Sequence, residues 1–155
     1  MKYKEYLLSA RRHSHVCKIL QEKILATTVD GGQINNDEIN YLALNLYYLS
    51  GYIIECSLKF KIFESVHFED NLDINVDTCR SKGLNYRKKI KIHNFSKLLE
   101  LLNTNVPDIS YASNIDEINE LLENWNPELR YEHSNIDYNK ILDLYNHTKL
   151  FLRQM

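Results

Sequence analysis

The segment from Tyr41 to Glu64 constrains the fold most, because its apolar residues repeat at helical spacing on two separate sides. One stripe advances by alternating steps of four and three residues, the spacing of a helix face packed against another helix: Leu42, Leu46, Leu49, Ile53, Cys56, Phe60 and Phe63. A second stripe follows a different side and contains Ala43, Tyr47, Ile54 and Leu58, with Gly51 in line. A helix with two apolar faces needs neighbours on both. We therefore expect it to be central to its domain, or to a dimer formed through the second stripe.

Helical spacing of apolar residues continues on both sides of this segment. It predicts a first helix from about Lys2 to Ala26 and, after the central helix, further helices over 94–102, 114–125 and 134–155. Residue pairs typical of helix N-termini precede three of the helices: Asn35 with Glu38, Asn114 with Glu117, and Ser134 with Asp137. No strand-like alternation is evident. The sequence thus predicts an all-α fold: an antiparallel bundle of four to five helices in a single domain over residues 1–155.

Composition and charge narrow the classes of function. The 155 residues suffice for a hydrophobic core, and a net charge of −2 argues against a protein that coats duplex DNA through a large basic face. The three cysteines form no CxxC pair, no signal peptide opens the chain, and no apolar run approaches the ~20 residues that span a bilayer. We expect a reduced, cytoplasmic protein without membrane contact. Neither a Gly-rich phosphate loop nor a zinc-binding Cys/His spacing occurs, so no cofactor and no metal are expected.

Residues 68–92 have no clear periodicity, and their charges are divided along the segment. The first half is acidic, whereas the second half contains Arg87, Lys88, Lys89 and Lys91 within five residues. Such a concentration of cations in an irregular segment favours contact with nucleic acid. A solvated charge run is the alternative.

Polar residues on the remaining side of the central helix form a second candidate binding site. Glu55 and Lys59 lie one turn apart between the two apolar stripes, on the side that also carries Tyr48 and Tyr52. Charges so close to apolar surface are costly unless they are paired or used. The four residues could line a cleft for a nucleotide. Alternatively, Glu55 and Lys59 form an ordinary i,i+4 pair, or Glu55 holds Arg130 inside the bundle.

Three segments carry a family resemblance. The run from Tyr48 to Lys59 contains a small residue followed by Gly-Tyr, then Glu and Leu-Lys. The segment from His93 to Leu99 begins with a His, a polar residue and an apolar residue. The segment from Trp125 to Tyr131 ends in Arg-Tyr. These segments resemble parts of the second helix, the third helix and the approach to the last helix of the HEPN superfamily of small prokaryotic helical proteins. The resemblance implies a HEPN-like helical domain that commonly dimerises and works in toxin–antitoxin, phage-defence or CRISPR-linked systems.

The resemblance also implies a candidate catalytic pair. Catalytic HEPN members cleave RNA with an Arg and a His separated by four to six residues at a dimer cleft. Arg130 and His133 are nearest to that position, with two residues between them. An Arg can grip phosphate and a His can act as a base near neutral pH, but Arg130 could instead pair with an acid such as Glu55, leaving His133 solvated. Arg87 and His93 match the spacing but lie elsewhere in the chain.

The sequence leaves three functions open. The first is a non-catalytic or atypical subunit that binds RNA, a nucleotide or a partner protein, such as a nucleotidyltransferase or a defence effector. The second is a metal-independent endoribonuclease that uses Arg130 and His133 in a homodimer. The third is a structural helical subunit that docks a larger partner. A further cluster, Arg11 to His15 on the first helix, predicts either contact with RNA phosphates or a partner, or a solvated helix face.

Overall fold

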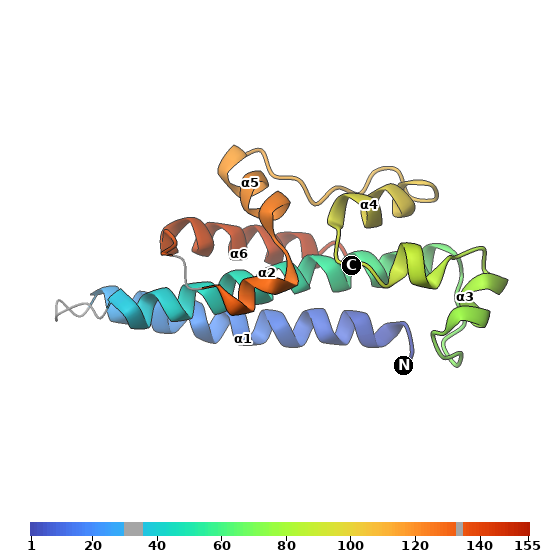
Figure 1. Cartoon of the computed structure of the whole chain (residues 1–155), viewed down its shortest axis with the longest axis horizontal. Coiled ribbons are helices and arrows are strands. Elements are labelled where there is room, and N and C mark those ends of the chain that lie inside the picture. Colours follow the sequence, from blue (N-terminus) through green and yellow to red (C-terminus); the bar gives the residue numbers. More distant parts are fainter. Residues whose placement is uncertain (30–35, 133–134) are drawn as a thin grey trace.

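The computed structural model describes residues 1–29, 36–132 and 135–155, and these residues form helices and loops without any strand. Three long helices make up the body of the fold: α1 (Lys4–Val29), α2 (Asn36–Ser65) and α6 (Tyr138–Leu152). Shorter elements lie between α2 and α6 in the chain: α3 (Val76–Ser81), the π-helical turn η1 (Tyr86–Ile90), α4 (Phe95–Asn103), α5 (Asp116–Asn124) and the 3-10 turn η2 (Pro127–Tyr131). Figure 1 shows α1 and α2 antiparallel and side by side, with α6 along them. The predicted all-α helical bundle is confirmed.

α2 is the central helix, as the sequence predicts, because it packs against α1, α4, α6 and η2. Residues of both predicted stripes are buried within the chain. In the second stripe, Ala43, Ile54 and Leu58 are fully buried, and Tyr47 is 4% exposed. The Tyr47 hydroxyl also donates a hydrogen bond of 2.6 Å to the carbonyl oxygen of Leu121 in α5. The expectation that this stripe forms a dimer surface is therefore wrong, because the chain's own helices already cover it.

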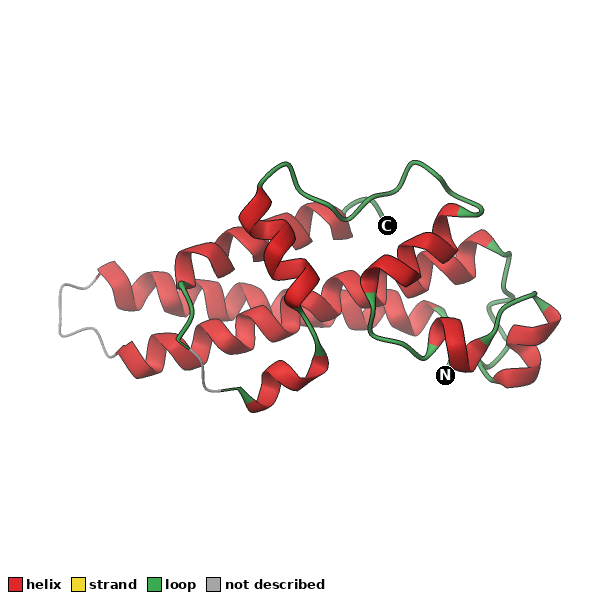
Figure 2. Cartoon of the chain, turned by 45° about the horizontal axis from the view of Figure 1, so that its top comes forward, coloured by secondary structure: helices red, strands yellow, loops and turns green. Residues whose placement is uncertain are grey.

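Residues 68–92 contain two short helices that the sequence pattern does not reveal. α3 begins with a capping box in which Asn75 and Thr78 bond to each other's backbone N–H groups. Gly83 then adopts a φ of +72°, which a glycine reaches without steric cost, and η1 follows. Figure 2 shows these short helices at the end of the bundle where the N-terminus lies. α3 buries Cys79 and η1 buries Ile90. With six and five residues, neither element has enough turns to show a period.

The helix N-termini agree only partly with the predicted capping residues. Asn94 caps α4 by accepting a hydrogen bond from the backbone N–H of Lys97. The predicted pair of Asn114 with Glu117 is wrong, because Ile115 occupies the N-cap of α5 without a side-chain hydrogen bond. Asp137 itself caps α6. Asn35 and Ser134, predicted to cap α2 and α6, lie outside the described residues.

Candidate functional site

The three segments that carry the family resemblance meet around Trp125, the residue after α5. The Trp125 indole N–H donates to the carbonyl oxygen of Tyr48 at 3.1 Å, and the ring stacks on Phe95 with centroids 4.8 Å apart. A Cβ atom at Gly51 would lie only 2.1 Å from the indole, so the close approach of Trp125 to α2 requires a glycine there. Phe95 of α4 and Trp125 thus pack together against α2 at Tyr48 and Gly51.

Glu55 lies on the polar side of α2 with both carboxylate oxygens engaged. Its Oε1 accepts a hydrogen bond from Lys59 Nζ at 2.8 Å, and its Oε2 lies 2.7 Å from His93 Nδ1. The side chains of Glu55 and Lys59 are 5% and 6% exposed, whereas that of His93 is 50% exposed. The i,i+4 pair considered for Glu55 and Lys59 is therefore present. The expected contact of Glu55 with Arg130 is wrong, because Lys59 and His93 occupy the carboxylate.

The contact with Glu55 gives His93 a defined orientation. A carboxylate oxygen 2.7 Å from Nδ1 favours the tautomer with its hydrogen on Nδ1, which leaves Nε2 as an acceptor. Within the described ranges, no protein group bonds to Nε2. A carboxylate that orients a half-exposed imidazole is a common arrangement for a general base. The same contact also anchors the start of α4 to α2, which is a structural role.

Tyr52 separates two histidines in this region. Its ring centroid is 5.6 Å from that of His13 on α1 and 6.4 Å from that of His93. Burial raises the pKa of Tyr52, so its phenol stays protonated near neutral pH. Tyr48 lies against Tyr52 with centroids 5.0 Å apart. The tyrosines expected to line this side of α2 therefore lie together. We call Glu55, Lys59, His93, Tyr52 and His13 the Glu55 cluster.

His13 is the member of the Glu55 cluster that sequence reasoning did not single out. Burial lowers its pKa, the positive charge of Arg12 lowers it further, and the negative charge of Glu55 partly opposes both effects. His13 is therefore mainly neutral at pH 7 and can accept a proton. In the sequence it appears only as part of the run from Arg11 to His15. No local pattern distinguishes it, because its place in the cluster depends on how α1 packs on α2.

Arg130 lies on η2 and is exposed. Its guanidinium carbon is 4.7 Å from the ring centroid of Tyr131. The pKa of Arg130 is raised, mainly by its hydrogen bond with the Tyr48 side chain. Its positive charge also acts on Tyr52, so it is near the Glu55 cluster without pairing with Glu55. His133 lies outside the described residues, so the geometry of the candidate Arg130–His133 pair is not described.

The cations of the basic segment are displayed on and beside η1. Arg87, Lys88, Lys89 and Lys91 are all exposed, and we call them the η1 surface. Over the part of the chain that the structure covers, none of the four forms an ion pair with a carboxylate. They therefore remain available to an external anion.

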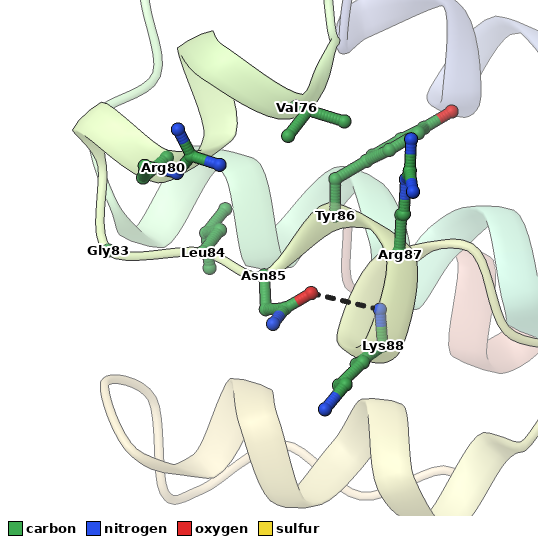
Figure 3. A pocket seen from close by; sticks show the side chains of 8 residues that line it. All are labelled: Val76, Arg80, Gly83, Leu84, Asn85, Tyr86, Arg87 and Lys88. Carbon is green, nitrogen blue, oxygen red and sulfur yellow. Dashed lines mark hydrogen bonds between the residues drawn. The ribbon is translucent and has the colours of Figure 1, made fainter.

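Two hollows border the η1 surface. Arg87 and Lys88 line one of about 580 Å³ between α3 and η1, and Figure 3 shows Arg80 and Arg87 on opposite sides of it. The Asn85 carboxamide oxygen accepts from the backbone N–H of Lys88 at 3.0 Å and holds the first turn of η1. Lys88 and Lys89 line a second hollow of about 290 Å³ against α4. Lys88 belongs to both, so cations border a continuous stretch of surface.

The described residues contain neither a metal-binding cluster nor a membrane-spanning helix. Among residues 1–29, 36–132 and 135–155, no group of three or more His, Cys, Asp or Glu side chains is arranged to hold a metal ion. No helix in these ranges has the length and apolar character needed to cross a bilayer. Cys17, Cys56 and Cys79 are buried free thiols, and burial raises the pKa of Cys56 to about 12, so this thiol is not a reactive thiolate at neutral pH.

Comparison of the chain with protein-family models, with curated proteins and with solved structures finds no match.

Proposed function

We propose that this chain is a HEPN-like helical protein of a prokaryotic defence or toxin–antitoxin module, in which it acts as an RNA-binding subunit through the η1 surface. The unpaired cations of that surface carry the proposal. Clustered charges without acidic partners repel one another, and a polyanion relieves that repulsion. The HEPN-like part of the proposal draws support from the three resembling segments, which meet around Trp125. A second copy of the chain, a nucleotidyltransferase or a defence effector remains the proposed protein partner.

The arrangement of the η1 surface favours a single strand over a duplex. Its cations lie on one short turn beside two hollows of about 580 and 290 Å³. A duplex requires a long basic face, and the chain has a net charge of −2. A flexible single strand can follow a short basic track and place bases in adjacent hollows.

Binding of a fluorescent single-stranded RNA at several salt concentrations tests this function. The variant Arg87→Ala/Lys88→Ala/Lys89→Ala should bind at least tenfold more weakly. The slope of log K against log salt should become shallower by about 2, because each lost phosphate contact on a single strand removes ~0.7 from that slope. The control, Lys23→Ala/Lys61→Ala/Lys140→Ala, removes the same charge elsewhere. Equal affinity of the two variants would refute the η1 surface as the site, and absence of RNA binding by the wild type would favour a structural subunit.

A second candidate function is metal-independent RNA cleavage, and the contact of Glu55 with His93 specifically favours it. An oriented imidazole can take the proton of a ribose 2′-hydroxyl, and nearby cations such as Arg130 can stabilise the charge on phosphate. In this proposal His93, rather than His133, is the base.

Cleavage of RNA in the presence of EDTA tests this candidate. We expect His93→Ala to abolish cleavage, whereas Asn103→Ala, an exposed change at the far end of the helix that follows His93, should retain it. Activity that survives His93→Ala but is lost in Arg130→Ala and His133→Ala would instead favour the pair that the family resemblance implies. Absence of cleavage by the wild type leaves RNA binding as the function.

A further inference from the structure

A third basic hollow lies between α1 and α6, on residues that belong neither to the η1 surface nor to the Glu55 cluster. Its volume is about 480 Å³, and it is lined by side chains from the middle of α1 and from the second half of α6 and its C-terminal end. The Tyr145 hydroxyl in its lining donates to the carbonyl oxygen of Ser14 at 2.9 Å. This hydrogen bond joins the two helices, so the hollow has a fixed floor.

Basic side chains project around this hollow from both helices. Arg11, His15 and Lys18 follow one another on α1 at steps of four and three, which places them on one face. Lys149 and Arg153 are four residues apart at the end of α6 and face the same hollow. Among the described residues, no Asp or Glu side chain lines it. Positive charges of two helices are thus brought together without an acid between them.

The protein itself compensates little of this charge. Lys18 has an exposed ion pair with Glu22 at 3.7 Å, and Lys149 Nζ lies 4.8 Å from the centroid of the Tyr145 ring. Arg11 and Arg153 form no ion pair with any residue that the structure covers. The negative end of the α6 dipole explains cations near its C-terminus, but it does not explain those in the middle of α1. An anion bound in the hollow accounts for both sets.

The chemistry of the lining indicates a ligand with several phosphate groups. Guanidinium groups such as those of Arg11 and Arg153 bind phosphate in a bidentate manner, and Lys18 and Lys149 add point charges. Cations spread over two helices suit a chain of phosphates better than one isolated phosphate. The volume of about 480 Å³ is typical of a site for a small molecule. Leu152 and Met155 add an apolar portion to the lining, against which an uncharged part of the ligand can pack.

We propose that the hollow between α1 and α6 binds a small molecule that carries a chain of at least two phosphate groups, with Arg11 and Arg153 as its principal ligands. This site goes beyond the proposed RNA contact and does not depend on it. The phosphate chain can come from an inorganic polyphosphate or from a nucleoside polyphosphate. The apolar portion of the lining distinguishes these sources, because only a nucleoside can use it.

Isothermal titration calorimetry of the full chain with inorganic tripolyphosphate, orthophosphate and adenosine triphosphate tests the proposal at 0.15 M salt. The wild type should bind tripolyphosphate at least tenfold more tightly than orthophosphate. Arg11→Gln/Arg153→Gln should lose at least tenfold in affinity, and Lys18→Gln/Lys149→Gln should lose affinity in the same direction. The matched control Lys23→Gln/Lys140→Gln, at two exposed lysines outside both the hollow and the η1 surface, should stay within twofold of the wild type. Tighter binding of the nucleotide than of tripolyphosphate would assign the apolar portion to a nucleoside, and equal binding would assign the site to the phosphate chain alone.

Three outcomes would overturn the proposal: no tripolyphosphate binding by the wild type, unchanged affinity in Arg11→Gln/Arg153→Gln, or an equal loss in the Lys23→Gln/Lys140→Gln control. Both arginines are exposed, so circular dichroism should show each variant folded as the wild type. RNA binding measured on the same variants separates the two proposals. Arg11→Gln/Arg153→Gln should retain RNA binding at the η1 surface, whereas Arg87→Ala/Lys88→Ala/Lys89→Ala should lose it.

Discussion

Replacement of Glu55 by Gln tests whether the buried charges of the Glu55 cluster depend on one another. The substitution keeps the shape of the side chain and removes its charge. In the native protein, Glu55 Oε1 lies 2.8 Å from Lys59 Nζ. In the variant, the Lys59 side chain, which is 6% exposed, loses this anionic partner. Removal of one member of a buried ion pair typically costs about 3–5 kcal/mol, because the other charge stays desolvated and uncompensated. We expect Glu55→Gln to lower the free energy of unfolding by about that amount.

Urea unfolding followed by circular dichroism measures this loss, and fluorescence of Trp125, the only tryptophan in the sequence, gives a second probe next to the cluster. Glu64→Gln is the matched control, since Glu64 forms an i,i+3 pair with Lys61 but its side chain is 44% exposed. The control should change stability by no more than about 1 kcal/mol. The double variant Glu55→Leu/Lys59→Met should recover most of the stability lost by Glu55→Gln, because it buries no unpaired charge.

Two results would refute this reasoning. A loss below about 1 kcal/mol in Glu55→Gln would show that Lys59 does not depend on the Glu55 charge. A double variant as unstable as Glu55→Gln would show that shape or the contact with His93, rather than charge balance, holds the cluster together. Recovery in the double variant together with loss of RNA cleavage would separate the structural role of the ion pair from a catalytic role of the Glu55–His93 contact.

Three further predictions concern neighbouring residues. Gly51→Ala should destabilise the fold by about 1–3 kcal/mol and shift the Trp125 emission, because the added Cβ would lie 2.1 Å from the indole; unchanged stability in urea would contradict the observed packing. Arg130→Ala should change the free energy of unfolding by no more than about 0.5 kcal/mol, since the side chain is exposed and not paired with Glu55; a loss of several kcal/mol would restore the buried pair first expected from the sequence. The pKa of His13 is lower in the folded chain than its ordinary value of 6.5, so the folded state binds fewer protons than the unfolded state. The contribution of His13 to stability is therefore complete above about pH 6.5 and is lost as the pH falls below that value. The stability difference between wild type and His13→Gln should therefore shrink between pH 7.5 and pH 5.5, and a constant or growing difference would contradict the assigned shift.

Local features of the sequence were sufficient for the long helices. The two stripes between Tyr41 and Glu64 repeat over many turns, so their period identifies a helix that must be buried on two sides, as α2 is. The same reasoning located α4, whose Asn94 cap and inward Phe95 and Leu98 agree with the structure. Short elements such as η1 gave no such signal, because one turn contains too few residues to show a period.

The sequence by itself determined that the chain is helical and that α2 is central. It also identified Glu55, Lys59 and the run from Arg87 to Lys91 as the charged residues of the candidate binding sites. Only the tertiary structure decided the partners of those charges. His93 follows Glu55 by 38 positions and His13 belongs to another helix, and their contacts with the cluster arise from the packing of α4 and α1 on α2. Periodicity records which face of a helix is buried, but it carries no information on which distant side chain covers that face. For the same reason, the second stripe of α2 could be assigned to a dimer from the sequence, whereas the folded chain fills it with its own helices.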